Sequence, residues 1–243
     1  MPFSTIDKGS KYFNTVLWTG DGSTSKAITG VGFKPDFVWL KQRSASTYYH
    51  RLQDGVRGAG KLLYSNATDA EGDVGTGTGG SIRTFDTDGF TIGSEAGTNT
   101  NAVTMVSWSW LGSNTTASNT SGTITSTVSA NTTSGFSIVS YTYTSGNVTV
   151  GHGLGVAPSM IIVKARSVSD NWRIYHKSLG NSAFVPFTTA AQATGSYWNN
   201  TSPTSSVFSI GSSWGGTDTT IAYCFARSEE HTSELQSRFG ISY

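Results

Sequence analysis

Short apolar stretches separated by turn-forming residues recur along the whole chain. Apolar and polar residues alternate over 103–110, and four apolar residues stand together at 37–40 after Pro35. Alternation predicts a half-buried strand, and a short apolar run bounded by turn residues predicts a buried one. Further strands are expected over 12–18, 62–64, 81–85, 89–92, 123–130 and 135–142. A helix is expected at most over 188–193.

Glycine, asparagine and aspartate mark the turns between these strands. Residues 19–22 (Thr-Gly-Asp-Gly) follow the first strand, residues 86–88 (Asp-Thr-Asp) separate two strands, and residues 131–135 (Asn-Thr-Thr-Ser-Gly) separate another pair. Each pattern is typical of a β-hairpin. Many short strands joined by such turns indicate antiparallel sheets rather than βαβ units. The sequence therefore predicts an all-β protein of antiparallel β-sandwiches, jelly-roll or lectin-like in type.

The chain also contains an internal repeat. Residues 32–44 align without gaps with residues 155–167, and Gly, Pro, Lys, Arg and Ser coincide at an offset of 123. The same offset places Phe13 on Phe136 and Gly30 on Gly153. Downstream, Tyr49-His50 meets Tyr175-His176 at an offset of 126, residues 90–93 meet 208–211 at 118, and residues 108–110 meet 223–225 at 115. Because the order never changes, the pattern predicts two homologous sandwich units in tandem.

Changes in composition set the expected boundaries. Unit one is residues 1–112, a Ser/Thr-rich linker is residues 113–122, and unit two is residues 123–226. The last segment, 227–243, carries 5 charges in 17 residues, against 26 in the 226 before it. Its opening, Arg-Ser-Glu-Glu-His-Thr-Ser-Glu-Leu-Gln-Ser, resembles the translation of a sequencing-library adapter, so a truncated gene with a non-native tail is expected. The alternative is an amphipathic C-terminal helix capped by Ser228.

Composition and charge exclude several classes of protein. The chain has 36 Ser, 35 Thr and 29 Gly in 243 residues, which argues against a helical bundle. With 16 basic and 15 acidic residues it has no broad cationic surface, so neither nucleic acid nor a membrane surface is an expected partner. It has no apolar run of membrane-spanning length and no signal-like start, so membrane insertion is not expected. One cysteine and four scattered histidines predict neither a disulfide nor a metal or other cofactor site.

Residues that could carry chemistry are sparse. A glycan hydrolase needs two carboxylates beside the scissile bond, and the candidates in unit one, Asp54 and Glu71 among them, fall mostly in Gly-rich turns. Unit two has only Asp170 and Asp218. His152 is interpreted as a turn histidine and Cys224 as a small strand residue. No catalytic residues are therefore expected and the protein is predicted not to be an enzyme; a glycan hydrolase or depolymerase stays the alternative.

Aromatic residues beside polar ones are the best candidates for a ligand site. Tyr49-His50 in unit one and Trp172 through Tyr175-His176 in unit two take the same place in the repeat. Aromatic faces and polar groups together suit a shallow sugar site. The alternative is simple alternation, with Tyr49 and Tyr175 packed and His50 and His176 in solvent. Two tryptophans in polar loops, Trp198 and Trp214, are further candidates for exposed contact.

Several segments together suggest a family. Residues 54–71 (Asp-Gly-Val-Arg-Gly-Ala-Gly-Lys-Leu-Leu-Tyr-Ser-Asn-Ala-Thr-Asp-Ala-Glu), 85–93, 106–110, 135–141 and 151–158 resemble a repeat domain of uncharacterised tailed-phage virion proteins, described as tail-fibre-like or minor structural. The resemblance covers residues 5–226. It implies a virion location after assembly in the host cytoplasm, further repeats after Ala226 and other tail proteins as partners. The expected role is a structural or adhesion module that either binds a host-surface glycan or serves as a spacer. A homotrimer is the assembly such fibres suggest.

Overall fold

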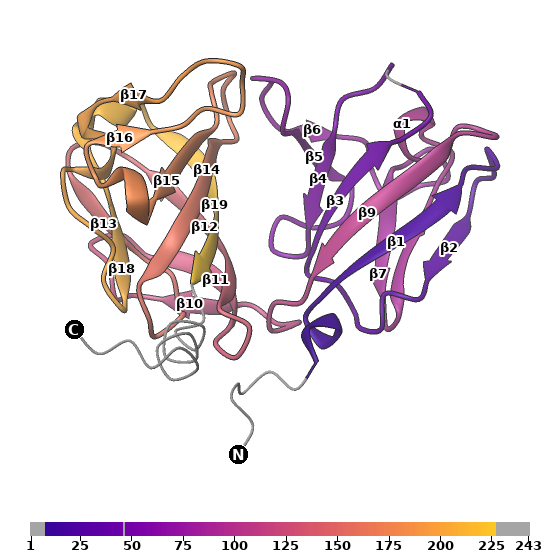
Figure 1. The fold of residues 1–243 in the computed structure, drawn as a ribbon, viewed down its shortest axis with the longest axis horizontal. Coiled ribbons are helices and arrows are strands. Elements are labelled where there is room, and N and C mark those ends of the chain that lie inside the picture. The colour runs from indigo at the N-terminus through magenta and orange to yellow at the C-terminus, as the bar shows by residue number, and fades with distance from the viewer. Residues whose placement is uncertain (1–7, 46, 227–243) are drawn as a thin grey trace, which may run out of the picture.

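The computed structural model describes residues 8–45 and 47–226 (Figure 1). Strands make up nearly all of its regular structure. Within the described residues there is one short α-helix, α1 (Ala96–Asn99). The 3-10 helices are η1 (Gly9–Lys11), η2 (Lys177–Leu179), η3 (Ser196–Trp198) and η4 (Ser212–Trp214). The named strands pair antiparallel throughout, which confirms the all-β sandwich class. Within the same residues, no helix has both the length and the apolar character that a bilayer crossing requires.

Two sheets build unit one. Its inner sheet has the order β1-β9-β3-β4-β5-β6 and its outer sheet the order β2-β8-β7. The inner strands are β1 (Phe13–Thr19), β9 (Thr104–Trp110), β3 (Phe37–Gln42), β4 (Arg51–Asp54), β5 (Lys61–Tyr64) and β6 (Gly72–Asp73). The outer strands are β2 (Lys26–Thr29), β8 (Gly89–Ile92) and β7 (Ile82–Asp86).

Unit two has one six-stranded sheet and two small sheets. Its inner sheet has the order β10-β11-β12-β19-β14-β15, and β13-β18 and β16-β17 form two small sheets. The inner strands are β10 (Ala117–Asn119), β11 (Ser126–Asn131), β12 (Phe136–Tyr143), β19 (Asp218–Ala226), β14 (Pro158–Ala165) and β15 (Arg173–His176). The others are β13 (Val148–Gly151), β18 (Val207–Ile210), β16 (Ala183–Phe184) and β17 (Ala193–Thr194).

The central strands β3 and β14 are buried on both faces of their sheets, and the side chains of a strand point alternately to these two faces. In β3, Phe37 lies in a middle core and Val38 in the core under outer sheet one. In β14, Ile161 lies in the outer core of unit two and Ile162 in the middle core. The apolar run at 37–40 is therefore a strand buried on two sides.

The middle core joins the two units. It contains Phe37, Leu52 and Leu63 of unit one together with Phe136, Ile138, Ile162, Trp172, Ile174, Ile221 and Tyr223 of unit two. In Figure 1, β14 and β19 lie on the side of unit two that faces β3 and β4 of unit one. The two inner sheets thus pack face to face, with one apolar core on each outer side and a third between them.

Most predicted strands and turns are confirmed. Strands occupy 13–19, 37–42, 61–64, 82–86, 89–92, 104–110, 126–131 and 136–143. The 86–88 turn joins β7 to β8, and the Asp88 carboxylate accepts hydrogen bonds from the amides of Gly30 and Gly32 at 3.0 and 2.6 Å. The helix expected over 188–193 is wrong, since bends and the start of β17 occupy that segment. Part of the predicted linker is strand β10, which pairs with β11. The predicted tail, 227–243, lies outside the described residues.

The inner sheets share a four-strand order. In unit one it is β1-β9-β3-β4, and in unit two it is β12-β19-β14-β15. The registers agree with the sequence offsets, because Phe13 and Phe37 both lie opposite Trp110, while Phe136 and Met160 both lie opposite Phe225. Homology of the two units stays a prediction, and the matching order is the structural observation that bears on it.

Candidate functional site

The predicted aromatic residues of unit two are mostly buried. Tyr175 is 3% exposed and packs its ring on Trp198 with a centroid distance of 5.7 Å, whereas His176 is exposed. This is the packed-tyrosine alternative rather than an open aromatic site. Trp172 is also buried, in the middle core, and its indole N–H donates to the carbonyl of Tyr64 at 2.8 Å.

The expectation that Trp198 and Trp214 are exposed is wrong. Their loops fold over the outer core of unit two, and the two side chains are 2% and 4% exposed. The indole N–H of Trp198 donates to the carbonyl of Ala183 at 2.9 Å, so its one polar atom is satisfied in the interior. A polar loop sequence therefore did not indicate an exposed ring.

Tyr49 and His50 take a different place from Tyr175 and His176. Tyr49 is 50% exposed and lies edge-on to Tyr64, and His50 is partly buried. Burial lowers the pKa of His50, and the nearby Lys41 charge lowers it further. The expectation that the two aromatic pairs are equivalent is wrong, because the strand register equates other residues.

The equivalent residues are two buried arginines. Arg51 lies opposite Leu40 in unit one, and Arg173 lies opposite Val163 in unit two. The Arg51 guanidinium lies 5.2 and 5.7 Å from the ring centres of Tyr48 and Tyr64 and pairs with Glu95 at 2.7 Å. The Arg173 guanidinium lies 4.4 and 4.6 Å from the ring centres of Tyr197 and Trp214, and it pairs with Asp170 at 2.6 Å. Stacked, paired guanidinium groups of this kind stabilise the fold. No sequence signal distinguished them from surface arginines.

A surface pocket of 200 Å³ lies beside the end of β15. It is lined by Val156, Ala157, Pro158, Ser159, Tyr175, Lys177, Ser202 and Pro203. Apolar carbons and hydroxyl groups thus share one small cavity with an ammonium group. This mixture fits a sugar, whose C–H faces contact apolar surface while its hydroxyls take polar partners. Of the predicted ligand residues, Tyr175 is the one that lines this pocket.

A larger groove of 430 Å³ lies where the linker meets unit one, with Lys34, Asp36, Phe85 and Asn114 among its lining residues. Burial raises the pKa of Asp36, although its hydrogen bonds oppose the rise. The Asp36 carboxylate accepts from the amides of Gly112 and Asn114 at 2.7 and 3.1 Å. The main acidic group of this groove is therefore already used to hold the linker.

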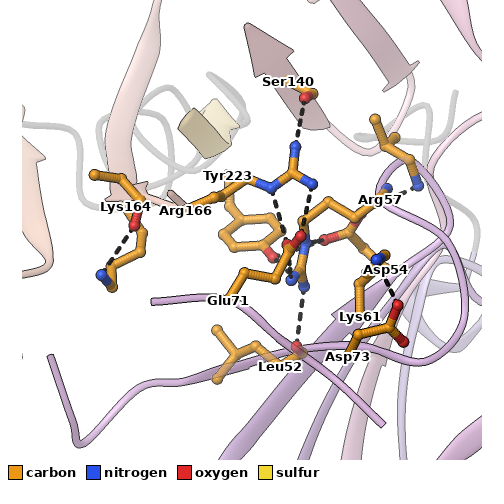
Figure 2. A network of polar contacts seen from close by, with 12 residues as sticks. Leu52, Asp54, Arg57, Lys61, Glu71, Asp73, Ser140, Lys164, Arg166 and Tyr223 are labelled. Carbon is orange, nitrogen blue, oxygen red and sulfur yellow. Dashed lines mark hydrogen bonds and ion pairs between the residues drawn. The ribbon is translucent and has the colours of Figure 1, made fainter. Parts of the chain in front are cut away.

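Asp54 and Glu71, the carboxylates considered for hydrolysis, belong to a charge network between the units (Figure 2). Asp54 and Arg57 are fully buried, with Nε and Oδ2 2.5 Å apart. The Tyr223 hydroxyl of unit two donates to Asp54 at 2.8 Å. Glu71 accepts two hydrogen bonds at 2.8 Å from Arg166 of unit two and one at 3.0 Å from Arg57. Both carboxylates therefore link unit one to unit two.

The charges in this network stabilise one another. Burial alone would raise the pKa of Glu71, but its hydrogen bonds to Arg166 and the charge of Arg57 lower the pKa overall. Burial alone would lower the pKa of Arg57, but the neighbouring Asp54 and Glu71 raise it overall. Glu71 is thus an anion and Arg57 a cation at neutral pH. A general acid in a glycosidase needs the opposite shift, a raised carboxyl pKa.

The histidine and cysteine singled out in the sequence are both in the interior. His152 is fully buried, its Nδ1 accepts from the amide of Leu154 at 3.2 Å, and its Nε2 lies 3.1 Å from the carbonyl of Thr204. This pattern assigns the proton to Nε2 and makes His152 a turn-bracing residue. Cys224 is fully buried in the outer core of unit two. Within 8–45 and 47–226, no three His, Cys, Asp or Glu residues are grouped to hold a metal ion.

Lys164 is a second charged group buried between the units. Its ammonium donates to the carbonyls of Thr68 in unit one at 3.1 Å and of Ala165 and Val168 at 2.9 and 3.4 Å. Burial lowers the pKa of Lys164 to about 8, from 10.5, and Asp170 only partly offsets this. Between these two values the unfolded chain holds a proton that the folded chain has released. Stability from this group therefore rises with pH across that window.

Replacing Lys164 by methionine is expected to remove this pH dependence. Between pH 7.5 and 9.5 the wild type should gain on the order of 1–2 kcal/mol of unfolding free energy relative to Lys164→Met. Urea denaturation of both proteins at the two pH values measures the difference, in which groups common to both cancel. Lys177→Met, at an exposed lysine, serves as the control and should show no such change. A wild-type advantage that is the same at both pH values would contradict the prediction.

Comparison with known proteins gives one result. A family model described as a domain of unknown function (DUF7483) matches residues 8–240. No curated protein and no solved structure matches the chain. The match spans both units and the residues between them.

Proposed function

Because the chain belongs to the family described as a domain of unknown function (DUF7483), we propose its role from its geometry: a tail-fibre-like structural module of a phage virion that attaches to host-surface glycans. The structural role in this proposal rests on one observation, the position of the Asp54 and Glu71 carboxylates. Both are bound by arginines between the two units rather than placed across an open cleft. Charged groups of this chain thus build a joined pair of sandwiches.

The tandem arrangement and the phage context belong to this proposal. The shared strand order of the inner sheets supports a duplicated unit. So do the backbone angles at the aligned glycines, since Gly30 and Gly153 have φ of 86° and 74°. A pair of sandwiches joined by a shared core is a suitable spacer in a fibre, assembled in the host cytoplasm with other tail proteins. The resemblance of residues 5–226 to virion repeat domains is the support for the phage context.

The pocket beside Tyr175 is the proposed glycan contact. Val156, Pro158 and Pro203 offer apolar carbons, and Lys177 offers a donor that no described carboxylate pairs with. An ammonium group in a cavity of this size can donate to ring hydroxyls or to a sugar carboxylate. The hydrolase alternative has less support, because its best carboxylates are engaged between the units.

Binding to a glycan array and to host cells tests the proposal with the full chain. Lys177→Ala is expected to weaken glycan binding about tenfold or more, as the loss of a charged hydrogen bond does. Lys34→Ala is the matched control, because Lys34 is an exposed lysine in the other groove, and it should bind within about twofold of wild type.

Absence of binding to any glycan or host cell, or equal binding by Lys177→Ala, would refute the proposed contact. Release of reducing sugars by the wild type that disappears in Glu71→Gln would favour the hydrolase instead. Circular dichroism of each variant separates loss of binding from loss of fold.

A further inference from the structure

The first strand of unit one has an open edge. In the part of the chain that the structure describes, β1 pairs with β9 on one side, and no strand pairs with its other side. The amide of Leu111 donates to the carbonyl of Tyr12, and the amide of Gly20 donates to the carbonyl of Val103. The main-chain amides and carbonyls of the even-numbered residues of β1 therefore point toward β9. Because antiparallel strands alternate in this respect, the amides and carbonyls of the odd-numbered residues of β1 point to the open edge.

The corresponding edge in unit two is covered. The strand in the place of β1 is β12, which pairs with β19 on one side and with β11 on the other. Six residues of β11, Ser126–Asn131, lie antiparallel to Phe136–Tyr141, and β10 extends the sheet by one more strand. In unit two, strand β11 thus occupies the edge that is open in unit one.

The open edge lacks the usual protection against pairing. Proteins block free strand edges with charges, proline or bulges. The segment Phe-Asn-Thr-Val-Leu-Trp-Thr of β1 contains no charged residue and no proline, and its pairing with β9 is regular. Phe13 and Leu17 are 40% and 57% exposed, which is unusual for large apolar side chains in this molecule. One blocked position is Thr15, whose amide donates to the Asn14 side chain at 2.9 Å.

We propose that the free edge of β1 binds an extended strand with the chemistry of β11, supplied by a neighbouring chain of the assembly. That chemistry is an alternation of Ser or Thr with small apolar residues, in the sequence Ser-Thr-Val-Ser-Ala-Asn. The strand adds antiparallel, through main-chain hydrogen bonds. Val128 lies opposite Val139 in unit two, and Val139 aligns with Val16, so the added strand places its valine opposite Val16. This inference does not depend on glycan binding.

A synthetic peptide with the sequence of residues 117–131 is the probe, titrated into the full chain. Saturable binding is expected, together with slowed hydrogen exchange at the amides of Leu17 and Thr19, which point to the edge. Leu17→Pro removes one of these donors, and proline is tolerated where the amide faces away from the sheet. It should weaken binding about fivefold to tenfold. Leu17→Thr keeps the amide and should bind within about twofold of wild type. Thr19→Pro repeats the test if Leu17→Pro fails to fold.

Three results would overturn the proposal. The first is that the peptide does not bind. The second is that both proline variants bind the peptide as tightly as the wild type does. The third is an edge whose Leu17 and Thr19 amides are already protected in the free chain. Dimerisation of the full chain that Leu17→Pro abolishes would assign the edge to a second copy of β1 and so replace the β11-like strand.

Discussion

Replacing Arg57 by methionine is expected to lower the free energy of unfolding by about 3–5 kcal/mol, the cost of breaking a buried ion pair on one side. Arg57 is fully buried and contacts Asp54, Glu71, the carbonyl of Leu52 and the Tyr223 hydroxyl. Methionine fills much of the same space but leaves the Asp54 carboxylate buried without its cation. The loss should be seen in urea denaturation followed by tryptophan fluorescence.

A double variant separates the charge from the packing. Asp54→Asn removes the stranded carboxylate while keeping an oxygen for the amides of Val56 and Arg57, which donate to Asp54 at 3.1 and 2.8 Å. Asp54→Asn combined with Arg57→Met should therefore be more stable than Arg57→Met alone. If the two losses simply add, an unpaired buried charge is not the cause.

The exposed pair Lys61–Asp73 is the control within the same region (Figure 2). Its atoms are 2.6 Å apart, but the two side chains are 38% and 56% exposed. Solvent weakens such pairs, so Lys61→Met should change stability by no more than about 0.5–1 kcal/mol. A loss as large as that of Arg57→Met would mean that burial does not distinguish the two pairs.

Strands and turns were predictable because their signals are local. The apolar run at 37–40 predicted a buried strand, and β3 is buried on both faces. The Asp-Thr-Asp turn at 86–88 was predictable since Asp and Gly suit tight turns. What covers each face of β3 was not predictable, because an apolar residue at 37 does not say which other sheet packs against it.

The side-chain sites were harder to predict, for three physical reasons. Trp198 and Trp214 are buried because the loops that carry them fold over the outer core, which a polar local sequence does not indicate. The aligned Tyr-His pairs are not equivalent: the strand registers equate Arg51 with Arg173, an offset of 122, whereas the Tyr-His match has an offset of 126. Glu71 was found as a carboxylate, but its partner Arg166 is 95 residues away. Such a pairing depends on how the two units pack.

Phe37→Ala is the second substitution with a large expected effect: it should lower the free energy of unfolding by about 3–5 kcal/mol. Phe37 is 2% exposed at the centre of the middle core. Its ring stacks on Tyr223 and Phe136 of unit two with centroid distances of 4.2 and 6.1 Å, and on Trp110 of unit one at 5.1 Å. Truncation leaves a cavity that both units line, so a change made in unit one should loosen unit two. Hydrogen exchange in peptides from β12 and β19 should accelerate, measured by mass spectrometry.

Phe90→Ala is the matched control for this coupling. Phe90 is fully buried in the core under outer sheet one, and all the residues around it belong to unit one. Its truncation should lower the free energy of unfolding by a similar amount, about 3–5 kcal/mol. The faster hydrogen exchange, however, should be confined to strands of unit one such as β2, β7 and β8. Because the two variants remove the same ring from similar depths, any difference in exchange within unit two measures the middle core alone. Equal exchange of β12 and β19 in the two variants would show that the units do not stabilise each other through Phe37.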